Sequence, residues 1–519
     1  MYSYVKTAVL SGIDAIMVDA EADVSDGLPC VDMVGFVSGE VRESKERIRT
    51  ALKNNGISLP AKRVTINLAP ASVKKSGSGL DLPIAVSIMT ALGIISQNDL
   101  NNVFMVGELR LDGAVSGING MLSYVLKAKE EGINKCIVPM DNLCEARLVS
   151  GIEIIGIEHL LDVLDAVSGK KVYYDESGIP VSEGMPDSSQ TILEEQEEGS
   201  SEKLDFSDIR GQQVLRRACE IAVAGMHNFL MTGPPGAGKT MVAKRIPTIL
   251  PPLLPEERLE VSKIYSVCGL MDGKRGLMTS RPIRSPHHTV SAAGLSGGGA
   301  VIKPGEVSLA HKGVLYLDEL PEFAPSALET LREPLEDRKI KITRAMNTVE
   351  YPADILLCSS MNPCKCGYYP SNRCTCTRQS VIKYRSRISK PLMDRIDLVV
   401  EAAAISFDEL NGSGSNESSA EIRKRVEKCH RIQQERYRDC DINFNSRLNP
   451  AMMQKFCALG EQENALMEKM YDKFKLTARG YHKILKVART IADLDESEKI
   501  LKKHLCEALC FRMETEQGR

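Results

Sequence analysis

A phosphate-binding pattern near the middle of the chain constrains its fold more than any other feature. Residues 231–240 read Met-Thr-Gly-Pro-Pro-Gly-Ala-Gly-Lys-Thr and contain G-x-x-x-x-G-K-T. An apolar run precedes the pattern and a helix-like segment, 241–245, follows it, which predicts strand, loop and helix in that order. Glycines let backbone N–H groups surround phosphates, and the helix N-terminus adds a favourable dipole. The expected phosphate-binding residues are Gly233, Pro234, Pro235, Gly236, Ala237, Gly238, Lys239, Thr240 and Met241.

The expected ligands are ATP and Mg²⁺. Lys239 would reach the β- and γ-phosphates, and Thr240 would hold the metal ion. Hydrolysis also needs a carboxylate at the end of a second strand, and the apolar run 314–317 ends at Asp318 and Glu319. Asp318 is therefore predicted to complete the Mg²⁺ site, and Glu319 to polarise the attacking water.

Length and composition indicate an ordinary globular chain of several domains. The 519 residues are 43% hydrophobic and 26% charged, with a formal net charge of −3, so binding to nucleic acid would need local basic patches. No apolar run approaches the roughly 18 residues of a membrane-spanning helix, so no membrane partner is expected. The N-terminus lacks a signal-peptide pattern, and most of the 15 cysteines stand singly among apolar residues, which favours reduced thiols and a cytoplasmic protein.

Shifts in composition divide the chain into three domains and two linkers. Residues 1–168 mix alternating strands with apolar helices, and 169–203 are acidic and Ser-rich, as in a flexible linker. Residues 204–402 alternate strands and helices, which predicts an α/β domain with a parallel sheet. Residues 403–420 read as a second linker and 421–519 as a helical domain.

A third apolar strand, 353–361, ends at Asn362, and a polar side chain there would orient the attacking water. In this respect the chain resembles the AAA+ ATPases, where such an asparagine is called sensor 1. The segment around Arg395 resembles the arginine-finger segment of the magnesium-chelatase branch, so Arg395 would act on a neighbouring subunit's nucleotide. The segment 476–479 resembles sensor 2, so Arg479 would touch the phosphates. A finger that acts in trans implies an oligomer, usually a hexamer.

The first domain resembles the proteolytic domain of Lon, a serine–lysine protease. The matching stretches are 70–83, 107–120 and 136–139, and the resemblance implies the α/β fold of ribosomal-S5 domain 2. The nucleophile position falls on Gly79 and the lysine position on Leu122. Because neither side chain can serve as nucleophile or base, the domain is expected to be proteolytically inactive.

A Lon-like domain before a magnesium-chelatase-like AAA+ core and a helical block is the arrangement of the YifB/ComM family, which the whole chain resembles. The resemblance implies a hexameric, DNA-dependent ATPase that promotes branch migration during natural transformation. Alternative interpretations are a motor subunit of a metal chelatase, a protein-remodelling AAA+ chaperone and a nucleotide-binding scaffold without turnover.

Residues 338–344 alternate basic and apolar side chains, as in a strand with one charged face, and 348–351 would complete a hairpin. In related rings a hairpin just before sensor 1 lines the central pore. The resemblance therefore implies that this charged face contacts single-stranded or branched DNA through its backbone. The alternative is a solvated charged face. The candidate residues are Arg338, Lys339, Lys341 and Arg344.

Four cysteines form the pattern C-x-C…C-x-C directly after Asn362. They are Cys364, Cys366, Cys374 and Cys376. Four thiolates this close in sequence fit one tetrahedral structural Zn²⁺, although the spacing differs from the usual C-x₂-C knuckle. Free or redox-active thiols and an iron–sulfur cluster are the alternatives.

Overall fold

A computed structural model describes residues 1–168, 204–271, 276–299, 302–344, 347–403 and 416–512. The described residues form two compact units. Unit 1 lies within 1–198 and 258–278, and unit 2 lies within 199–257 and 279–519. Both linker predictions fall largely outside the described residues, since 169–203 and 404–415 are not among them.

Unit 1 is built on a mixed seven-stranded sheet. Its strand order is β3-β4-β2-β1-β5-β8-β9, with β1, β2 and β4 paired antiparallel and the other pairs parallel. The β1 strand alternates buried and less buried residues, as expected when one face of a sheet covers a core. The strands are β1 (Tyr2–Ser11), β2 (Asp14–Ser25), β3 (Cys30–Val34), β4 (Arg63–Ala69), β5 (Val103–Met105), β8 (Lys135–Pro139) and β9 (Glu153–Ile157).

The helices of unit 1 bury apolar faces against this sheet. In α1 the hydroxyl of Ser38 accepts a hydrogen bond from the Val41 N–H, and the buried side chains recur at helical spacing. Every residue of α2 is buried, so this helix is central to the core. The elements are α1 (Gly39–Asn54), α2 (Asp81–Ala91), α3 (Met121–Glu130), α4 (Leu143–Ala146), α5 (Asp162–Ser168) and the small hairpin β6 (Glu108–Leu109) and β7 (Val115–Ser116).

Unit 1 also includes residues 258–278, most of helix α8 (Pro255–Val267) and the chain after it. The Gly120 N–H donates to the Ser266 carbonyl at 3.0 Å, and the Ser266 hydroxyl donates to the buried Glu145 carboxylate. The Leu122 N–H donates to the same carboxylate at 3.0 Å. The segment thus makes hydrogen bonds with the N-terminal end of α3 and with the Glu145 carboxylate, an arrangement that was not predicted from the sequence.

Unit 2 contains a five-stranded, all-parallel sheet with the order β11-β14-β17-β10-β18. The three central strands are completely buried, which explains why they read as unbroken apolar runs in the sequence. The strands are β10 (Phe229–Thr232), β11 (Ile283–Arg284), β14 (Val314–Leu317), β17 (Leu356–Met361) and β18 (Leu398–Glu401). Two antiparallel pairs accompany the sheet, β12 (Gly297–Gly298) with β13 (Lys303–Pro304), and β15 (Lys339–Arg344) with β16 (Asn347–Pro352).

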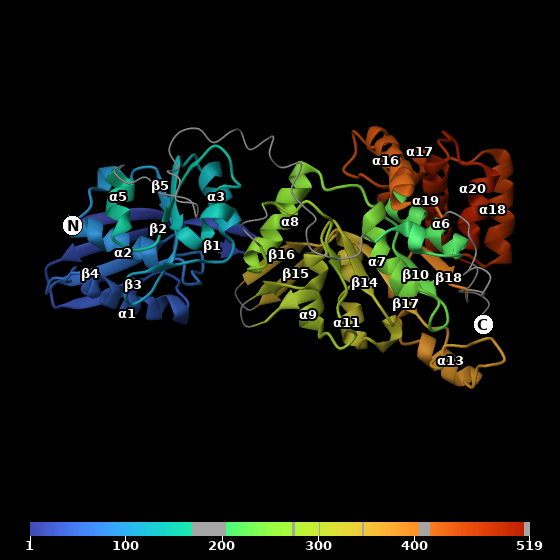
Figure 1. The fold of residues 1–519 in the computed structure, drawn as a ribbon, viewed down its shortest axis with the longest axis horizontal. Coiled ribbons are helices and arrows are strands. Elements are labelled where there is room, and N and C mark those ends of the chain that lie inside the picture. The colour runs from blue at the N-terminus through green and yellow to red at the C-terminus, as the bar shows by residue number, and fades with distance from the viewer. Residues whose placement is uncertain (169–203, 272–275, 300–301, 345–346, 404–415, 513–519) are drawn as a thin grey trace. The chain divides into compact units, whose positions relative to one another are not determined.

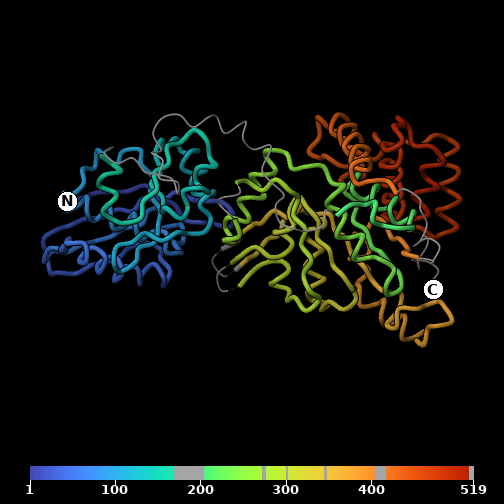
Figure 2. Tube along the Cα trace, viewed as in Figure 1, coloured from blue at the N-terminus to red at the C-terminus, as the bar shows by residue number. Residues whose placement is uncertain are grey.

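Helices flank the sheet and form a cluster of their own at the C-terminal end of the chain, drawn in orange and red in Figure 1 and traced in Figure 2. Within this cluster α19 buries Val487 and Ile491, as its apolar periodicity predicts. The helices of unit 2 are α6 (Gln213–Gly225), α7 (Lys239–Ile249), α9 (Ala292–Ser296), α10 (Glu306–Leu309), α11 (Pro325–Glu329), α12 (Arg332–Asp337), α13 (Arg378–Arg385), α14 (Lys390–Met393), α16 (Ser419–Arg436), α17 (Pro450–Phe456), α18 (Glu461–Lys473), α19 (Ala478–Leu494) and α20 (Lys502–Cys510).

The predicted fold class is confirmed: an α/β N-terminal unit, a parallel α/β sheet and a helical C-terminal region. Helix α16 begins at Ser419, inside the stretch 403–420 that the composition assigns to a linker. Ser418 and Glu421 form a capping box, in which each side chain accepts a hydrogen bond from the other residue's backbone N–H. The serines at the end of the predicted linker thus form the N-terminus of α16.

Candidate nucleotide site

The order of the strands brings the predicted nucleotide residues to one edge of the sheet. β17 lies between β10 and β14, and all three run parallel. The phosphate loop follows β10, Asp318 follows β14 and Asn362 follows β17. Because the carboxyl ends of parallel strands share one edge, these three elements converge there.

Lys239 sits at the first position of α7 and is 9% exposed. Its ammonium group donates to the Gly233 carbonyl at 2.7 Å, to the Pro234 carbonyl at 2.9 Å and to the Asn362 side-chain oxygen at 3.1 Å. Burial lowers the pKa of Lys239, while the nearby carboxylates of Asp318 and Glu319 act in the opposite direction. The structure thus places Lys239 and Asn362 together, beside the phosphate loop.

Asp318 and Thr240 form the second part of the site. The Thr240 hydroxyl donates to one Asp318 oxygen at 2.9 Å, and the Ser360 hydroxyl donates to the other. Burial alone would raise the pKa of Asp318, but hydrogen bonds from Ser360, Thr240 and Tyr316 bring it below the usual value. A carboxylate that stays ionised beside a threonine hydroxyl suits Mg²⁺, which binds oxygen ligands.

Sequence reasoning missed Ser360 and Tyr316. The Tyr316 hydroxyl lies 3.4 Å from the Thr240 hydroxyl oxygen. Both residues belong to completely buried strands, where a polar atom needs a partner. A polar side chain inside a predicted buried strand is the sequence signal by which Ser360 and Tyr316 could have been found.

Glu319 is exposed and has a left-handed backbone, with φ of +52°. This conformation costs about 1–2 kcal/mol for a residue other than glycine. Strain of this kind at the end of a strand beside a charged site is typical of catalytic positions.

Arg395 and Arg479 lie together, away from the phosphate loop of the same chain. Both line a pocket of about 320 Å³, whose described lining includes no residue of 233–241. Arg395 donates to the Pro391 carbonyl at 2.8 Å and pairs with Glu336. The Arg479 side chain is 68% exposed and lies 3.6 Å from Asp394. The pocket is rich in cations, since Arg447, Lys483 and Lys486 also line it, and burial lowers the pKa of Lys483 to about 8.

The predicted basic hairpin is present as β15 and β16. Ile340 pairs with Tyr351 on its buried face, and Lys341 pairs with Glu350 on its exposed face. Lys339 and Lys341 contact Glu350 at 2.9 and 3.5 Å. Arg344 ends β15, and its side chain lies outside the described part of the chain.

Arg338 differs from the expectation. It precedes the hairpin as the C-cap residue of α12, and its guanidinium lies 3.9 Å from Asp354. Burial, aided by the charge of Arg447, lowers the pKa of Arg338 to about 10. The structure therefore places Arg338 with Asp354 and not on the charged face of the hairpin.

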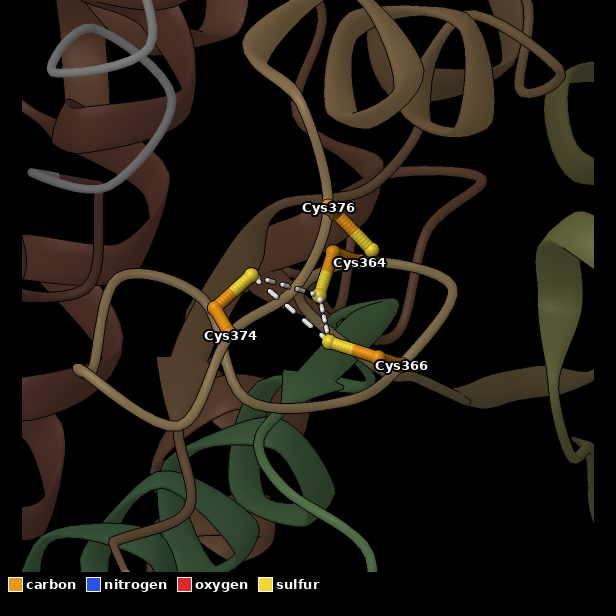
Figure 3. A group of neighbouring side chains, drawn as sticks. All are labelled: Cys364, Cys366, Cys374 and Cys376. Carbon is orange, nitrogen blue, oxygen red and sulfur yellow. Dashed lines mark hydrogen bonds between the residues drawn. The ribbon is translucent and has the colours of Figure 1, made fainter.

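The four cysteines of the loop after β17 converge. Their sulfur atoms lie within 4.8 Å of one another, and Figure 3 shows the side chains pointing to a common centre. All are free thiols in the structure, and Cys364 is buried while the other three are half-buried.

In unit 1 the two positions that correspond to a serine–lysine pair are buried in apolar surroundings. A Cβ atom at Gly79 would meet Val106 and Ile118 at 3.1 and 3.2 Å, and Leu122 is fully buried. The nearby polar residues have other partners, because Lys75 donates to the Pro70 carbonyl and Ser78 to Glu108.

Comparison with known proteins agrees with this architecture. Residues 205–410 match the family model described as magnesium chelatase, subunit ChlI. Residues 20–142 match subunit ChlI of Mg-chelatase, and 416–512 match its C-terminal model. The "Uncharacterized protein YifB" of Salmonella typhimurium is 38% identical over 509 residues, which cover 98% of this chain and 96% of that protein. "Competence protein ComM" of Haemophilus influenzae is 38% identical over 505 residues, which cover 96% and 95%.

The chain belongs to the YifB/ComM family. It therefore has a magnesium-chelatase-like AAA+ core, in accord with the sheet and phosphate loop described above. "Lon protease 2" of Bacillus subtilis is 30% identical over 148 residues, 27% of this chain and 26% of that protein. This partial match fits a YifB/ComM chain whose first unit has a Lon-like fold. Among the described residues, no helix combines the length and apolar character needed to cross a membrane.

Proposed function

We propose that this member of the YifB/ComM family is a Mg²⁺-dependent ATPase that works as a hexameric ring on DNA. The convergence of Lys239, Thr240, Asp318 and Asn362 at one edge of the sheet carries the ATPase part of the proposal. In this assignment Lys239 stabilises phosphate charge, and Thr240 and Asp318 hold Mg²⁺. Glu319 positions the attacking water, and Asn362 orients it.

The pocket that holds Arg395 and Arg479 supports the oligomer. Its five lysine and arginine side chains outnumber its three carboxylates, which suits a triphosphate, yet its described lining includes no residue of the chain's own phosphate loop. We propose that Arg395, and Arg479 beside it, act on the nucleotide bound by the adjacent subunit. A closed ring then places one phosphate site at each interface between subunits.

Two observations support DNA as the substrate of the motor. The hairpin β15–β16 presents Lys339 and Lys341 on its exposed face, and one relative is named a competence protein. We propose that the hairpin contacts single-stranded or branched DNA through phosphates, and that the motor remodels DNA by helicase or branch-migration activity in recombination or natural transformation.

A metal-chelatase motor is a second candidate, favoured by the three matches to magnesium-chelatase models. The two candidates differ in what stimulates ATP hydrolysis. We propose measuring the ATPase rate with single-stranded, duplex and forked DNA at two salt concentrations, and with a porphyrin plus Mg²⁺, using Lys239→Ala as the inactive control. Stimulation by DNA that weakens with salt is expected, and a rate indifferent to every DNA would contradict the proposal.

Three further parts of the proposal concern the remaining regions. The four cysteines would hold a structural Zn²⁺, since four thiolates leave no open position for catalysis. Unit 1 would have no peptidase activity, because Gly79 and Leu122 offer neither nucleophile nor base. We also propose a cytoplasmic location, supported by ATP as the expected cofactor and by cysteines that stand mostly singly among apolar residues.

A further inference from the structure

Three of the four sulfur atoms are separated by distances close to those between the ligands of one tetrahedral metal ion. Cys364 Sγ lies 3.3 Å from Cys366 Sγ and 3.7 Å from Cys374 Sγ, and the last two are 3.6 Å apart. A Zn–S bond of about 2.3 Å gives a tetrahedral sulfur–sulfur edge of about 3.8 Å. A disulfide would need about 2.05 Å. The spacing of these three sulfur atoms therefore suits ligands of one ion, and the Cys376 sulfur lies within 4.8 Å of them.

Burial does little to hold the loop that carries the four cysteines in place. Between residues 367 and 376 only Gly367 is buried, so the loop contributes almost no apolar core. Its backbone hydrogen bonds are local turns, such as the Cys374 N–H to the Ser371 carbonyl at 2.9 Å. A metal ion would supply the stabilisation that burial does not.

The loop that carries the four cysteines packs closely against the phosphate loop. Gly367 has φ of +86°, and a Cβ atom there would lie 2.4 Å from Cδ of Pro235 and 2.8 Å from its Cγ. Pro235 is in the middle of the phosphate loop, so only a glycine allows this close approach. Cys364 itself follows Asn362 by two residues, and it is fully buried.

The C-terminal end of the loop also lies near Asn362. Helix α13 starts just after Cys376, and its Arg385 donates to the Pro363 carbonyl at 3.1 Å. The guanidinium of Arg385 also lies over the Tyr369 ring, 5.5 Å from its centre. The loop therefore leaves from Asn362 and returns beside it.

We infer that Cys364, Cys366, Cys374 and Cys376 bind one Zn²⁺ whose role is to hold Gly367 against Pro235 and so keep the phosphate loop in its nucleotide-binding conformation. The inference deepens the proposed function, because it rests on nucleotide binding at residues 233–241. Zinc here positions the loop and takes no part in hydrolysis. Its loss frees Gly367 and Pro235, and nucleotide then has to order the phosphate loop as it binds.

The test measures zinc and nucleotide affinity separately on the full chain. Metal content is determined by mass spectrometry after purification without chelator, and affinity by fluorescence of a labelled ADP. We expect one zinc per chain, released by an organomercurial and absent from Cys374→Ser. Release of zinc, or substitution of Cys374 by serine, should raise the nucleotide Kd about ten-fold. Circular dichroism checks folding, and mercurial release on the wild-type chain serves where Cys374→Ser does not fold.

Gly367→Ala separates positioning from metal binding. We expect it to keep its zinc but to raise the nucleotide Kd by a similar factor, because its methyl group displaces Pro235. Gly132→Ala is the matched control, since Gly132 has φ of +73° but open space around its Cβ position. It should leave both measurements unchanged.

Three results would each overturn a different part of the inference or of the proposed function. A wild-type chain that holds iron or no metal refutes the zinc site. If the wild-type chain holds zinc, but its nucleotide Kd changes by less than about two-fold both on zinc release and in Gly367→Ala, the link between the zinc site and the phosphate loop is refuted. Wild-type chain that binds nucleotide no better than Lys239→Ala refutes the proposed function instead, while its zinc content still tests the metal site.

Discussion

The ammonium group of Lys239 lies 3.1 Å from the side-chain oxygen of Asn362, although the two residues are 123 positions apart. The contact joins the start of α7, which follows β10 and the phosphate loop, to the end of β17, the neighbour of β10 in the sheet. It means that the residue expected to bind phosphate and the residue expected to orient water share one site.

Glu319→Gln should stop ATP hydrolysis while nucleotide still binds. The change removes the carboxylate that accepts a proton from water but keeps nearly the same shape, so we expect kcat to fall by about 10²–10⁴-fold. Steady-state ATPase assays and nucleotide-binding measurements check this together. A variant with the wild-type rate would rule out Glu319 as the base.

Ser360→Ala should lower the free energy of unfolding by an amount that depends on pH. Removing this hydrogen bond raises the pKa of Asp318 towards its ordinary value, and we expect a loss of about 1 kcal/mol in the free energy of unfolding at neutral pH. Because the folded-state pKa of Asp318 is depressed, its contribution is complete above the unfolded-state value of about 4. The difference from wild type should disappear as the pH falls through the folded-state pKa.

Ser359→Ala is the control for this experiment. Ser359 is equally buried, but its hydroxyl donates to the Phe229 carbonyl at 3.2 Å and not to a carboxylate. Denaturant titrations at several pH values should show a loss that does not vary over the acid range. Equal pH dependence in both variants would count against the role of Ser360.

Arg395→Ala and Lys239→Ala should complement each other when mixed. Each alone should lose ATPase activity, the arginine variant by about 10³-fold or more. In mixed rings about a quarter of the interfaces combine an intact phosphate loop with an intact arginine finger. We expect activity to return on mixing, with co-assembly confirmed by two affinity tags. Rings that contain both variants yet stay inactive would contradict action in trans.

Lys339→Ala with Lys341→Ala should weaken DNA binding and its dependence on salt. If both lysines neutralise phosphates, the slope of log K against log salt should become shallower by about 1.4 for single-stranded DNA, roughly 0.7 per contact. Binding titrations at several salt concentrations measure this slope. The double variant Lys428→Ala with Lys503→Ala is the control, because these lysines also form exposed ion pairs, with Glu496 and Asp495. An unchanged slope in the hairpin variant would exclude these contacts.

Ser266→Ala should loosen the segment 258–278 within unit 1. The Glu145 carboxylate is buried and would lose one of its donors, which costs about 1–2 kcal/mol locally. Hydrogen exchange of peptides from 258–271 should become faster. Ser168→Ala, at an exposed position of the same unit, should leave this exchange unchanged. Equal protection in Ser266→Ala and wild type would show that the hydrogen bond does not hold the segment.

The sequence by itself determined the features that depend on neighbouring residues. The phosphate loop, the carboxylates after β14, the paired cysteine motifs and the hairpin β15–β16 are encoded in short stretches, through local backbone preferences and hydrophobic periodicity. The YifB/ComM resemblance rested on the order of a Lon-like domain, a magnesium-chelatase-like AAA+ core and a helical block, and the comparisons confirm it.

Only the tertiary structure decided which distant residues meet. It gave Asp318 a hydrogen bond from Ser360, turned Arg338 towards Asp354, set Arg395 beside Arg479 and joined residues 258–278 to α3. These contacts depend on strand order and on which face of each helix is covered. The reason is physical: local preferences fix backbone conformation over a few residues, whereas long-range contacts follow from how complete elements bury their apolar faces together.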